Sequence, residues 1–224
     1  MIYIGLDLGQ AADFTAQAVI DYVSETKGPY TNPVTDRYMN LVKLSRFSLG
    51  TPYTDIIDAV REFVVSEPFR LQGNKFRDYH LILDGTGVGR PVVDLARRAR
   101  LTLTAATITG GTNEKFDPIT GYWNVGKALL VTNTLVLLET GKLRIAKDIE
   151  EADTLKSELA NFKMKISISG NDTFEAWREK DHDDLVLAVC LACWYAEYHG
   201  IAGDPQHPTP RAHPLQDLRH KGFL

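Results

Sequence analysis

The sequence predicts a mixed α/β domain whose β-sheet begins as an antiparallel meander and continues with parallel strands. Three alternating apolar segments joined by short connections occupy the first fifty residues, which favours a meander. A strand–helix–strand unit follows over 81–108, and such a unit requires a right-handed crossover and parallel pairing. Near the end stands DHDDLVLAVCLACWY, in which acids run directly into a long apolar segment.

The first half of the chain alternates between strand and helix patterns. Strands are predicted at 2–8, in the segment AADFTAQAVIDYV with Asp13 in its turn, and in RYMNLVKLSRFSL. Helical spacing predicts a helix in 51–68 that is ended by Pro68. The short apolar run 81–83 predicts a buried strand, which a DGTGVG turn connects to a helix over 91–100.

The second half predicts one more strand, three helices and a hairpin. A strand over 101–108 is followed by a glycine-rich loop over 110–121. The predicted elements after it are a helix over 122–141, an extended piece over 142–149, an amphipathic helix over 150–162, a β-hairpin over 162–177 that turns at 170–172, and a last helix to about His199.

Composition bounds the domain organisation. The 224 residues are 44% hydrophobic and 24% charged with a formal net charge of -4, which is typical of a globular protein and excludes a strongly basic coat protein. We expect one domain over 1–199 and a flexible tail over 200–224, which is rich in Pro and His and has no periodicity. Neither a signal peptide nor a membrane-spanning segment is expected.

Acidic residues stand where predicted strands and a predicted helix end or begin. Asp7 lies in the first strand after the apolar run IYIGL, Asp84 ends the strand that begins at Leu81, and Asp183 and Asp184 begin the last helix. Open α/β sheets bind ligands outside the carboxyl ends of their strands. Each acid alone has a plainer explanation, as a turn former or a helix cap. If the first strand lies beside the strand 81–83, however, the acids become neighbours.

Converging carboxylates repel one another unless a cation compensates them. Carboxylate oxygens suit Mg²⁺ or Mn²⁺. Two such ions about 3.5–4 Å apart can clamp the attacking and leaving oxygens of a phosphodiester. The pattern therefore predicts a two-metal phosphodiesterase site, with the apolar helix as the rigid support of its acids. Cys190 and Cys193 lack a second pair to complete a zinc site, and we expect both to be buried.

The motifs resemble the nuclease domain of phage terminase large subunits, which has an RNase H-like fold. The residues that carry the resemblance are IGLDLGQAADFTAQAV at 4–19, LILDGTGVGRPVVDLAR at 81–97 and HDDLVLAVCLA at 182–192, with support from YWNVGKALL and LETGKLRI. Similarity to this family implies a metal-dependent endonuclease that cuts double-stranded viral DNA during genome packaging. By position, it implies Asp7, Asp84 and Asp183 as catalytic ligands, with Asp184 as a close contender for the third place.

The resemblance also implies partners and a setting. Double-stranded DNA would be the substrate, portal and small terminase proteins possible partners, and the cytoplasm of the infected bacterial host the location. Basic residues of the middle region, including Arg90, Lys115, Lys127 and Arg144, are candidates for phosphate contacts, as are Lys163 and Lys165 of the predicted hairpin. Asp13, Asp181 and His182 are outer candidates for roles at the site.

One departure and three alternatives remain at this point. The family usually carries an ATPase motor, and nothing here matches G-x-x-x-x-G-K-[ST]. A RuvC-like resolvase of branched DNA would share the fold and the acids. An actin-like ATPase would explain IGLDLGQ and DGTG as phosphate loops. A docking module whose acids only cap and turn would show no metal dependence.

Overall fold

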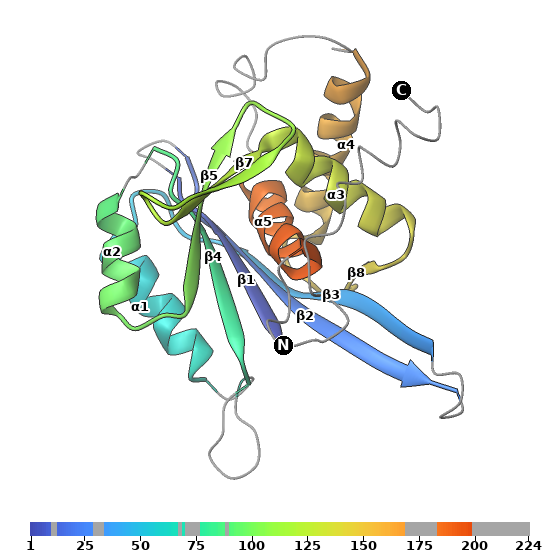
Figure 1. Cartoon of the computed structure of the whole chain (residues 1–224), viewed down its shortest axis with the longest axis horizontal. Helices are drawn as coiled ribbons and strands as arrows, with labels where there is room; N and C mark the ends of the chain where they lie inside the picture. Colours follow the sequence, from blue (N-terminus) through green and yellow to red (C-terminus); the bar gives the residue numbers. More distant parts are fainter. Residues whose placement is uncertain are drawn as a thin grey trace.

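The computed structural model describes residues 1–9, 13–28, 34–66, 69, 77–87, 90–168 and 183–198. They form an eight-stranded mixed sheet in the order β6-β7-β5-β4-β1-β2-β3-β8, covered by helices on both faces (Figure 1). The strands are β1 Ile2–Asp7, β2 Ala16–Lys27, β3 Val34–Arg46, β4 Tyr79–Asp84, β5 Leu103–Thr109, β6 Glu114–Asp117, β7 Tyr122–Gly126 and β8 Leu143–Ile145. The helices are α1 Tyr53–Val64, α2 Arg90–Arg98, α3 Lys127–Glu139, α4 Ala152–Ile168 and α5 Asp184–Tyr198.

The predicted sheet class is confirmed. Strands β1, β2 and β3 form an antiparallel meander, and β4 pairs with β1 in parallel. Strands β5 and β7 extend the sheet in parallel beyond β4. Strand β1 lies at the centre and is buried along its whole length, which explains why it is apolar on both faces.

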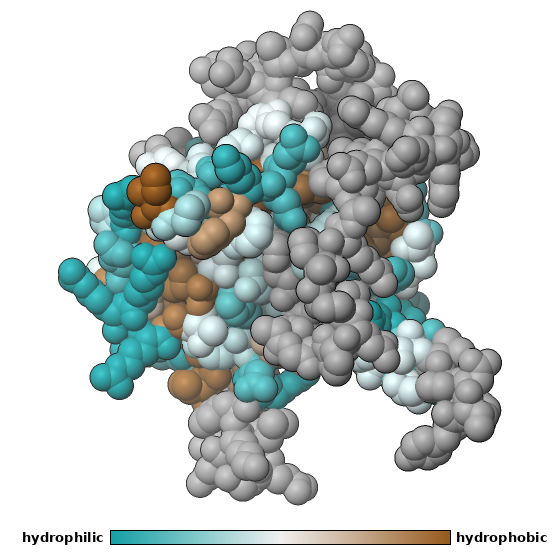
Figure 2. Space-filling view, in the orientation of Figure 1, coloured by the Kyte–Doolittle hydropathy of each residue, from teal (hydrophilic) through white to brown (hydrophobic). Residues whose placement is uncertain are grey.

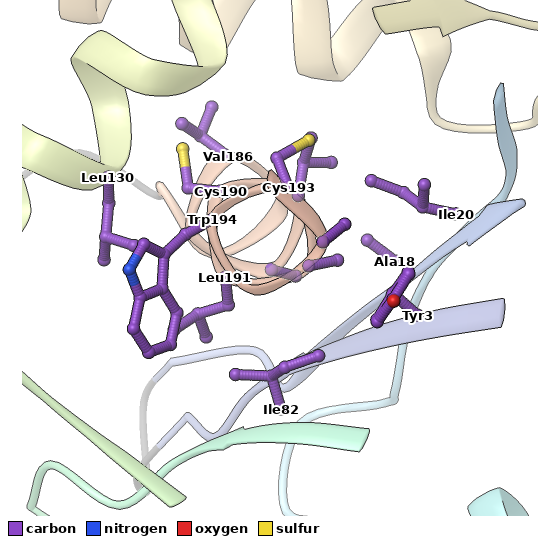
Figure 3. Close-up of a cluster of buried hydrophobic side chains, with 14 of the residues drawn as sticks. Tyr3, Ala18, Ile20, Ile82, Leu130, Val186, Cys190, Leu191, Cys193 and Trp194 are labelled. Carbon is purple, nitrogen blue, oxygen red and sulfur yellow. The ribbon is translucent and has the colours of Figure 1, made fainter. Parts of the chain in front are cut away.

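Two apolar layers cover the two faces of the sheet. Side chains of β1 alternate between them, with Tyr3 in one core and Ile4 in the other. One core contains α3 and α5, and the second contains α1 and α2. Figure 3 shows α5 enclosed by apolar side chains from the sheet and from α3, including Ile82 and Leu130. This environment explains why α5 is hydrophobic all round.

Glycine at position 5 allows α5 to lie directly on β1. A Cβ atom at Gly5 would stand 1.9 Å from the carbonyl oxygen of Ala188. Any side chain there would push the helix away from the sheet. The small residues of α5 and the glycine of β1 therefore set the depth at which the helix is seated.

Two sequence-based predictions in the second half are wrong. Residues 122–126 form β7 rather than the start of a helix, and β7 pairs as a hairpin with β6, which lies inside the predicted glycine-rich loop. Asp117 stabilises its turn by accepting hydrogen bonds from the backbone NH of Ile119 (2.9 Å) and the hydroxyl of Thr120 (2.8 Å). Only residues 127–139 of the predicted helix form α3.

The predicted hairpin at 162–177 is also wrong in its first part. Helix α4 continues through Phe162 to Ile168. The segment KMKISI alternates over too few residues to distinguish a strand from the last turns of a preceding helix. The rest of the predicted hairpin and the predicted tail lie outside the described residues.

Candidate active site

Two parallel neighbouring strands place Asp7 and Asp84 at the same edge of the sheet. Leu6 of β1 pairs with Leu83 of β4, and each strand ends one residue later with its aspartate. The predicted adjacency of these strands is confirmed. Asp84 also begins the turn that follows β4, because it accepts a hydrogen bond of 2.8 Å from the backbone NH of Thr86.

Helix α5 brings Asp184 to the same level. Ala188 lies over Gly5, and Tyr195 contacts Tyr3 with ring centroids 6.2 Å apart, so the helix runs antiparallel to β1. From Gly5 to Asp7 the strand rises about 6.6 Å, and from Ala188 back to Asp184 the helix rises about 6 Å. The two aspartates therefore end at the same height, and we call Asp7, Asp84, Asp183 and Asp184 the acidic cluster.

The acidic cluster is buried and electrostatically strained. Asp7, Asp84 and Asp184 are only 8%, 6% and 6% exposed. Burial raises the pKa of Asp7 well above 3.8, and the negative charges of Asp84, Asp184 and Asp183 raise the pKa further. A side-chain hydrogen bond with Asp84 acts in the same direction, and two carboxyl groups can share such a bond only when one holds a proton. The cluster thus carries more negative charge than its surroundings compensate.

Asp183 differs from Asp184 in its partner. Its carbonyl oxygen accepts a hydrogen bond from the backbone NH of Leu187 (2.9 Å), so Asp183 is the cap residue of α5. Its carboxylate forms an ion pair of 2.5 Å with the ammonium of Lys127, the first residue of α3. Asp184 also raises the pKa of Asp7 more than Asp183 does. The structure therefore places Asp184 deeper in the cluster than Asp183.

Two further residues of the site have no signal in the sequence. Arg46 ends β3 and hydrogen-bonds through its guanidinium to the carboxylate of Glu158 in α4. The second oxygen of Glu158 accepts a hydrogen bond of 3.2 Å from the backbone NH of Val186, and a nitrogen of Arg46 lies 3.6 Å from Asp184. Burial raises the pKa of Glu158 to about 7, although the charge of Arg46 opposes this shift.

The donor chemistry of the cluster fits a hard divalent cation. Carboxylate oxygens are what Mg²⁺ and Mn²⁺ prefer, and a cation would remove the repulsion that raises the pKa of Asp7. Among the residues that the structure describes, however, no three His, Cys, Asp or Glu side chains are arranged as a ready-made metal site. Cys190 and Cys193 are buried, and burial raises the pKa of the Cys190 thiol to about 12, so neither is suited to bind a metal.

The predicted DNA-binding residues lie in different environments. Arg90 and Lys115 are exposed, at the start of α2 and on β6, and hydrophilic residues cover the outside of α1 and α2 (Figure 2). Lys127 instead lies inside the acidic cluster, with its side chain 12% exposed. Arg144 stacks on the ring of Tyr38 at 3.8 Å and pairs through β8 with Asn40, about 17 Å along the sheet from the acids.

The structure describes the remaining predicted site residues only in part. Lys163 and Lys165 belong to α4, but their side chains are not among those described. Asp13 is exposed, and Asp181 and His182 lie outside the described residues. In the described part of the chain, no helix has the length and hydropathy needed to cross a membrane.

Comparisons with known proteins identify the fold. No family model and no curated protein matches the sequence. The terminase nuclease domain of human cytomegalovirus, Mn-soaked and inhibitor-bound, superposes with a TM-score of 0.51 at 13% identity, over 92% of this chain and 84% of that one. The large terminase nuclease of the thermophilic phage G20c, with bound zinc, gives 0.47 at 17% identity over 88% and 81%. The RuvC structure of Thermus thermophilus gives 0.35 at 15% identity, over 89% and 95%. The chain therefore has the fold of a terminase nuclease domain, as the resemblance in its sequence predicted.

Proposed function

We propose that this chain is a divalent-metal-dependent endonuclease that cleaves double-stranded DNA, and that it cuts viral DNA during genome packaging. The observation that carries the proposal is the convergence of Asp7, Asp84 and Asp184 from two strands and a helix at one buried edge of the sheet. The fold shared with a terminase nuclease domain supports it. The resolvase alternative gains nothing from the distant likeness to RuvC.

The acids of the cluster are the proposed metal ligands. Asp7 and Asp84 are fixed by neighbouring strands, and Asp184 by a helix that Gly5 seats against the sheet. We assign Asp184 as the third ligand, and Asp183, which is paired with Lys127, as a supporting fourth acid. When bound, two Mg²⁺ or Mn²⁺ ions would supply an activated water and stabilise the leaving oxygen of a phosphodiester.

The protein's own residues hold this arrangement rather than transfer protons. Rigid strand ends and a buried helix fix the directions of the carboxylates, so little reorganisation is needed on cation binding. Lys127 and Arg46 supply positive charge beside the acids. These residues lower the repulsion within the cluster in the metal-free protein, and Lys127 is also a proposed contact for a substrate phosphate.

Contacts to DNA outside the cluster are proposed for exposed basic residues. Arg90 follows the turn after Asp84, and Lys115 lies on the edge strand β6. Arg144, Lys163 and Lys165 stay predictions for more distant phosphates. Portal and small terminase proteins are the proposed partners, and the host cytoplasm the proposed location; a membrane is not part of the proposal.

Cleavage of supercoiled plasmid tests the proposed function. The purified chain with Mn²⁺ or Mg²⁺ should nick and then linearise the DNA, and EDTA should abolish cutting. Asp84→Asn should also abolish cutting, whereas Asp94→Asn, on the exposed side of α2, should leave it unchanged. Folded protein that cuts with neither metal would contradict the proposal. Nucleotide binding by that protein would then favour the actin-like alternative, and its absence the docking module.

A further inference from the structure

The ion pair between Arg46 and Glu158 links three elements at the start of α5. Arg46 ends β3, Glu158 lies in the middle of α4, and Val186 is in the first turn of α5. The side chains of Arg46 and Glu158 are only 17% and 7% exposed. Burying such a pair costs free energy unless further hydrogen bonds satisfy both charged groups.

The contacts of Glu158 reach the backbone of α5 directly. One carboxylate oxygen accepts from the guanidinium of Arg46, and the other accepts from the NH of Val186 at 3.2 Å. The first backbone NH groups of a helix have no partner within the helix, and a carboxylate there is also favoured by the helix dipole. Glu158 therefore acts as a cap supplied by a different helix, and it fixes the first turn that carries Asp184.

Arg46 reaches the side chain of Asp184 as well. A guanidinium nitrogen lies 3.6 Å from an oxygen of Asp184, beyond ordinary hydrogen-bond distance but close enough for electrostatic attraction. Arg46 is itself positioned by the ring of Phe14, 5.1 Å from its guanidinium carbon, and by β3, in which it pairs with Ala16. Ala16 in turn pairs with Asp7, so Arg46 is linked to Asp7 through the sheet and to Asp184 through its side chain.

We propose that Arg46 and Glu158 are positioning residues that hold Asp184 in the direction required for cation binding. They do not contact the cation; they fix the helix turn and the carboxylate that would. This inference rests on the proposed metal-dependent function. Partners that orient a metal ligand typically contribute 10–100-fold to metal affinity.

A charge-neutral replacement separates positioning from folding. In the variant Arg46→Met/Glu158→Met one positive and one negative charge leave together, and apolar side chains of similar length fill the space. Replacing a buried ion pair in this way is often neutral or stabilising, so the variant is expected to fold. The matched control is Arg77→Met/Asp21→Met, which removes a partly buried pair of 2.5 Å at the opposite end of the sheet.

Two measurements decide the proposal without depending on activity. Titration calorimetry with MnCl₂ should show a dissociation constant about 10–100-fold higher for the first variant and unchanged for the control. Amide hydrogen exchange in the metal-free protein should be faster at Val186 in the first variant only. Wild-type or tighter Mn²⁺ binding by folded Arg46→Met/Glu158→Met would overturn the inference, whereas absent Mn²⁺ binding by the wild-type chain would overturn the proposed function instead.

Discussion

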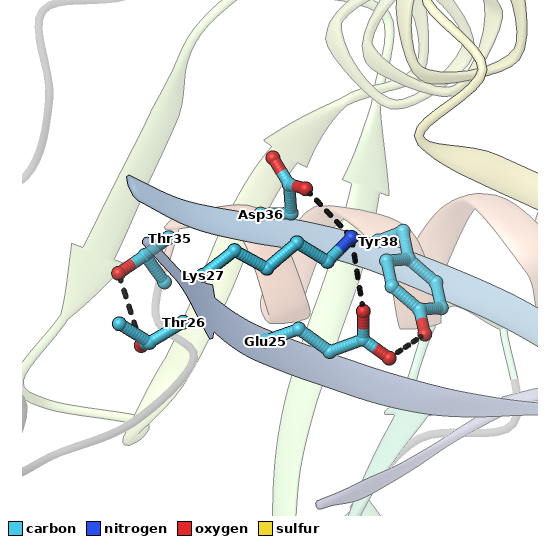
Figure 4. Close-up of polar contacts among 6 residues, drawn as sticks. All are labelled: Glu25, Thr26, Lys27, Thr35, Asp36 and Tyr38. Carbon is cyan, nitrogen blue, oxygen red and sulfur yellow. Dashed lines mark hydrogen bonds and ion pairs between the residues drawn. The ribbon is translucent and has the colours of Figure 1, made fainter. Parts of the chain in front are cut away.

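Strands β2 and β3 together form a long hairpin with charged residues at both of its ends, and the pKa shifts at the two ends have opposite effects on the charged forms. At one end Arg46 lies beside the buried acidic cluster. At the other, residues 22–27 of β2 and 34–38 of β3 form an arm that extends away from the helices (Figure 1). On the arm Lys27 contacts Asp36 at 3.1 Å and Glu25 at 3.3 Å, and Tyr38 donates to Glu25 at 2.7 Å (Figure 4).

Burial explains the difference. On the arm, the hydrogen bond from Tyr38 lowers the pKa of Glu25, and the hydrogen bond to Asp36 raises the pKa of Lys27, so the charged forms are favoured. In the acidic cluster, burial raises the pKa of Asp7, so its charged form is disfavoured. Exposed ion pairs keep both groups charged at little cost in free energy, whereas buried acids whose charges are only partly compensated are typical of binding and catalytic sites. A hollow of about 500 Å³ lies beside the arm rather than at the acidic cluster.

The largest expected effect is on activity at the buried end. Asp7→Asn should reduce metal-dependent cleavage at least about 100-fold, because loss of a ligand should exceed the loss of a residue that only orients one. The same variant should melt at a higher temperature than wild type in EDTA at neutral pH. A raised pKa means that Asp7 ionises less readily in the folded than in the unfolded protein, so this group opposes folding at any pH above its unfolded pKa, and asparagine removes that cost.

Plasmid cleavage and thermal melting in EDTA measure both effects on one preparation. A fall in cleavage together with a rise in melting temperature is the expected result. Loss of both activity and stability would show that Asp7 is a structural residue, and the contrast with the arm would then fail.

The seating of α5 is the next most sensitive feature. Gly5→Ala places a methyl group 1.9 Å from the Ala188 carbonyl oxygen, which neither backbone can avoid without moving. Unfolding in urea should show a loss of about 3 kcal/mol or more. Gly50→Ala is an unsuitable control because Gly50 has a φ of +77°, which strains any other residue. Ala18→Gly, at the position paired with Gly5 on the neighbouring strand, is the better reference for a change of one methyl group. Wild-type stability of Gly5→Ala would mean that α5 does not rest on β1.

His80 tests whether burial by itself, away from the acidic cluster, disfavours the charged form of a side chain. It lies on β4 far from Asp84, stacks on Tyr195 at 4.4 Å and bonds to Thr104 at 2.9 Å. Burial lowers its pKa from 6.5 to about 4. A lowered histidine pKa contributes stability that is present above pH 6.5 and lost as the pH falls towards 4.

His80→Phe should therefore flatten that part of the pH dependence. Between pH 7 and pH 4 the wild-type protein should lose about 2 to 3 kcal/mol relative to the variant, as measured by urea unfolding at each pH. Parallel profiles would show that His80 is accessible to water and titrates normally.

The smallest effect is expected on the arm. Lys27→Ala removes two exposed ion pairs and should leave both the melting temperature and plasmid cleavage unchanged within error. Raising the NaCl concentration should not create a difference in melting temperature between Lys27→Ala and the wild type. A clear loss of cleavage would show that the arm contributes to DNA binding, and Arg144, which stacks on Tyr38 of the arm, would then be the next residue to replace.

Sequence patterns were sufficient to predict an element where the spacing of its apolar residues matched the face that the fold buries. The alternation of β1 to β3, the crossover through α2 and the apolar run of α5 each predicted the element that formed. Patterns failed at 122–126 and 162–168, where short segments fit two periods and neighbouring strands or helices decided the outcome. Asp7, Asp84 and the Asp183–Asp184 pair could be singled out because each stands at the end of a recognisable element.

The sequence by itself determined the sheet class, the order of its elements and the acids at their ends, because strand and helix periods and end positions are local properties. Only the tertiary structure decided that Asp184 lies deeper than Asp183, that Lys127 joins the cluster, and that Arg46 meets Glu158 across 112 positions. Those relations depend on how closely α5 rests on β1 and where α3 and α4 pack around it, and no local pattern encodes a distance between elements.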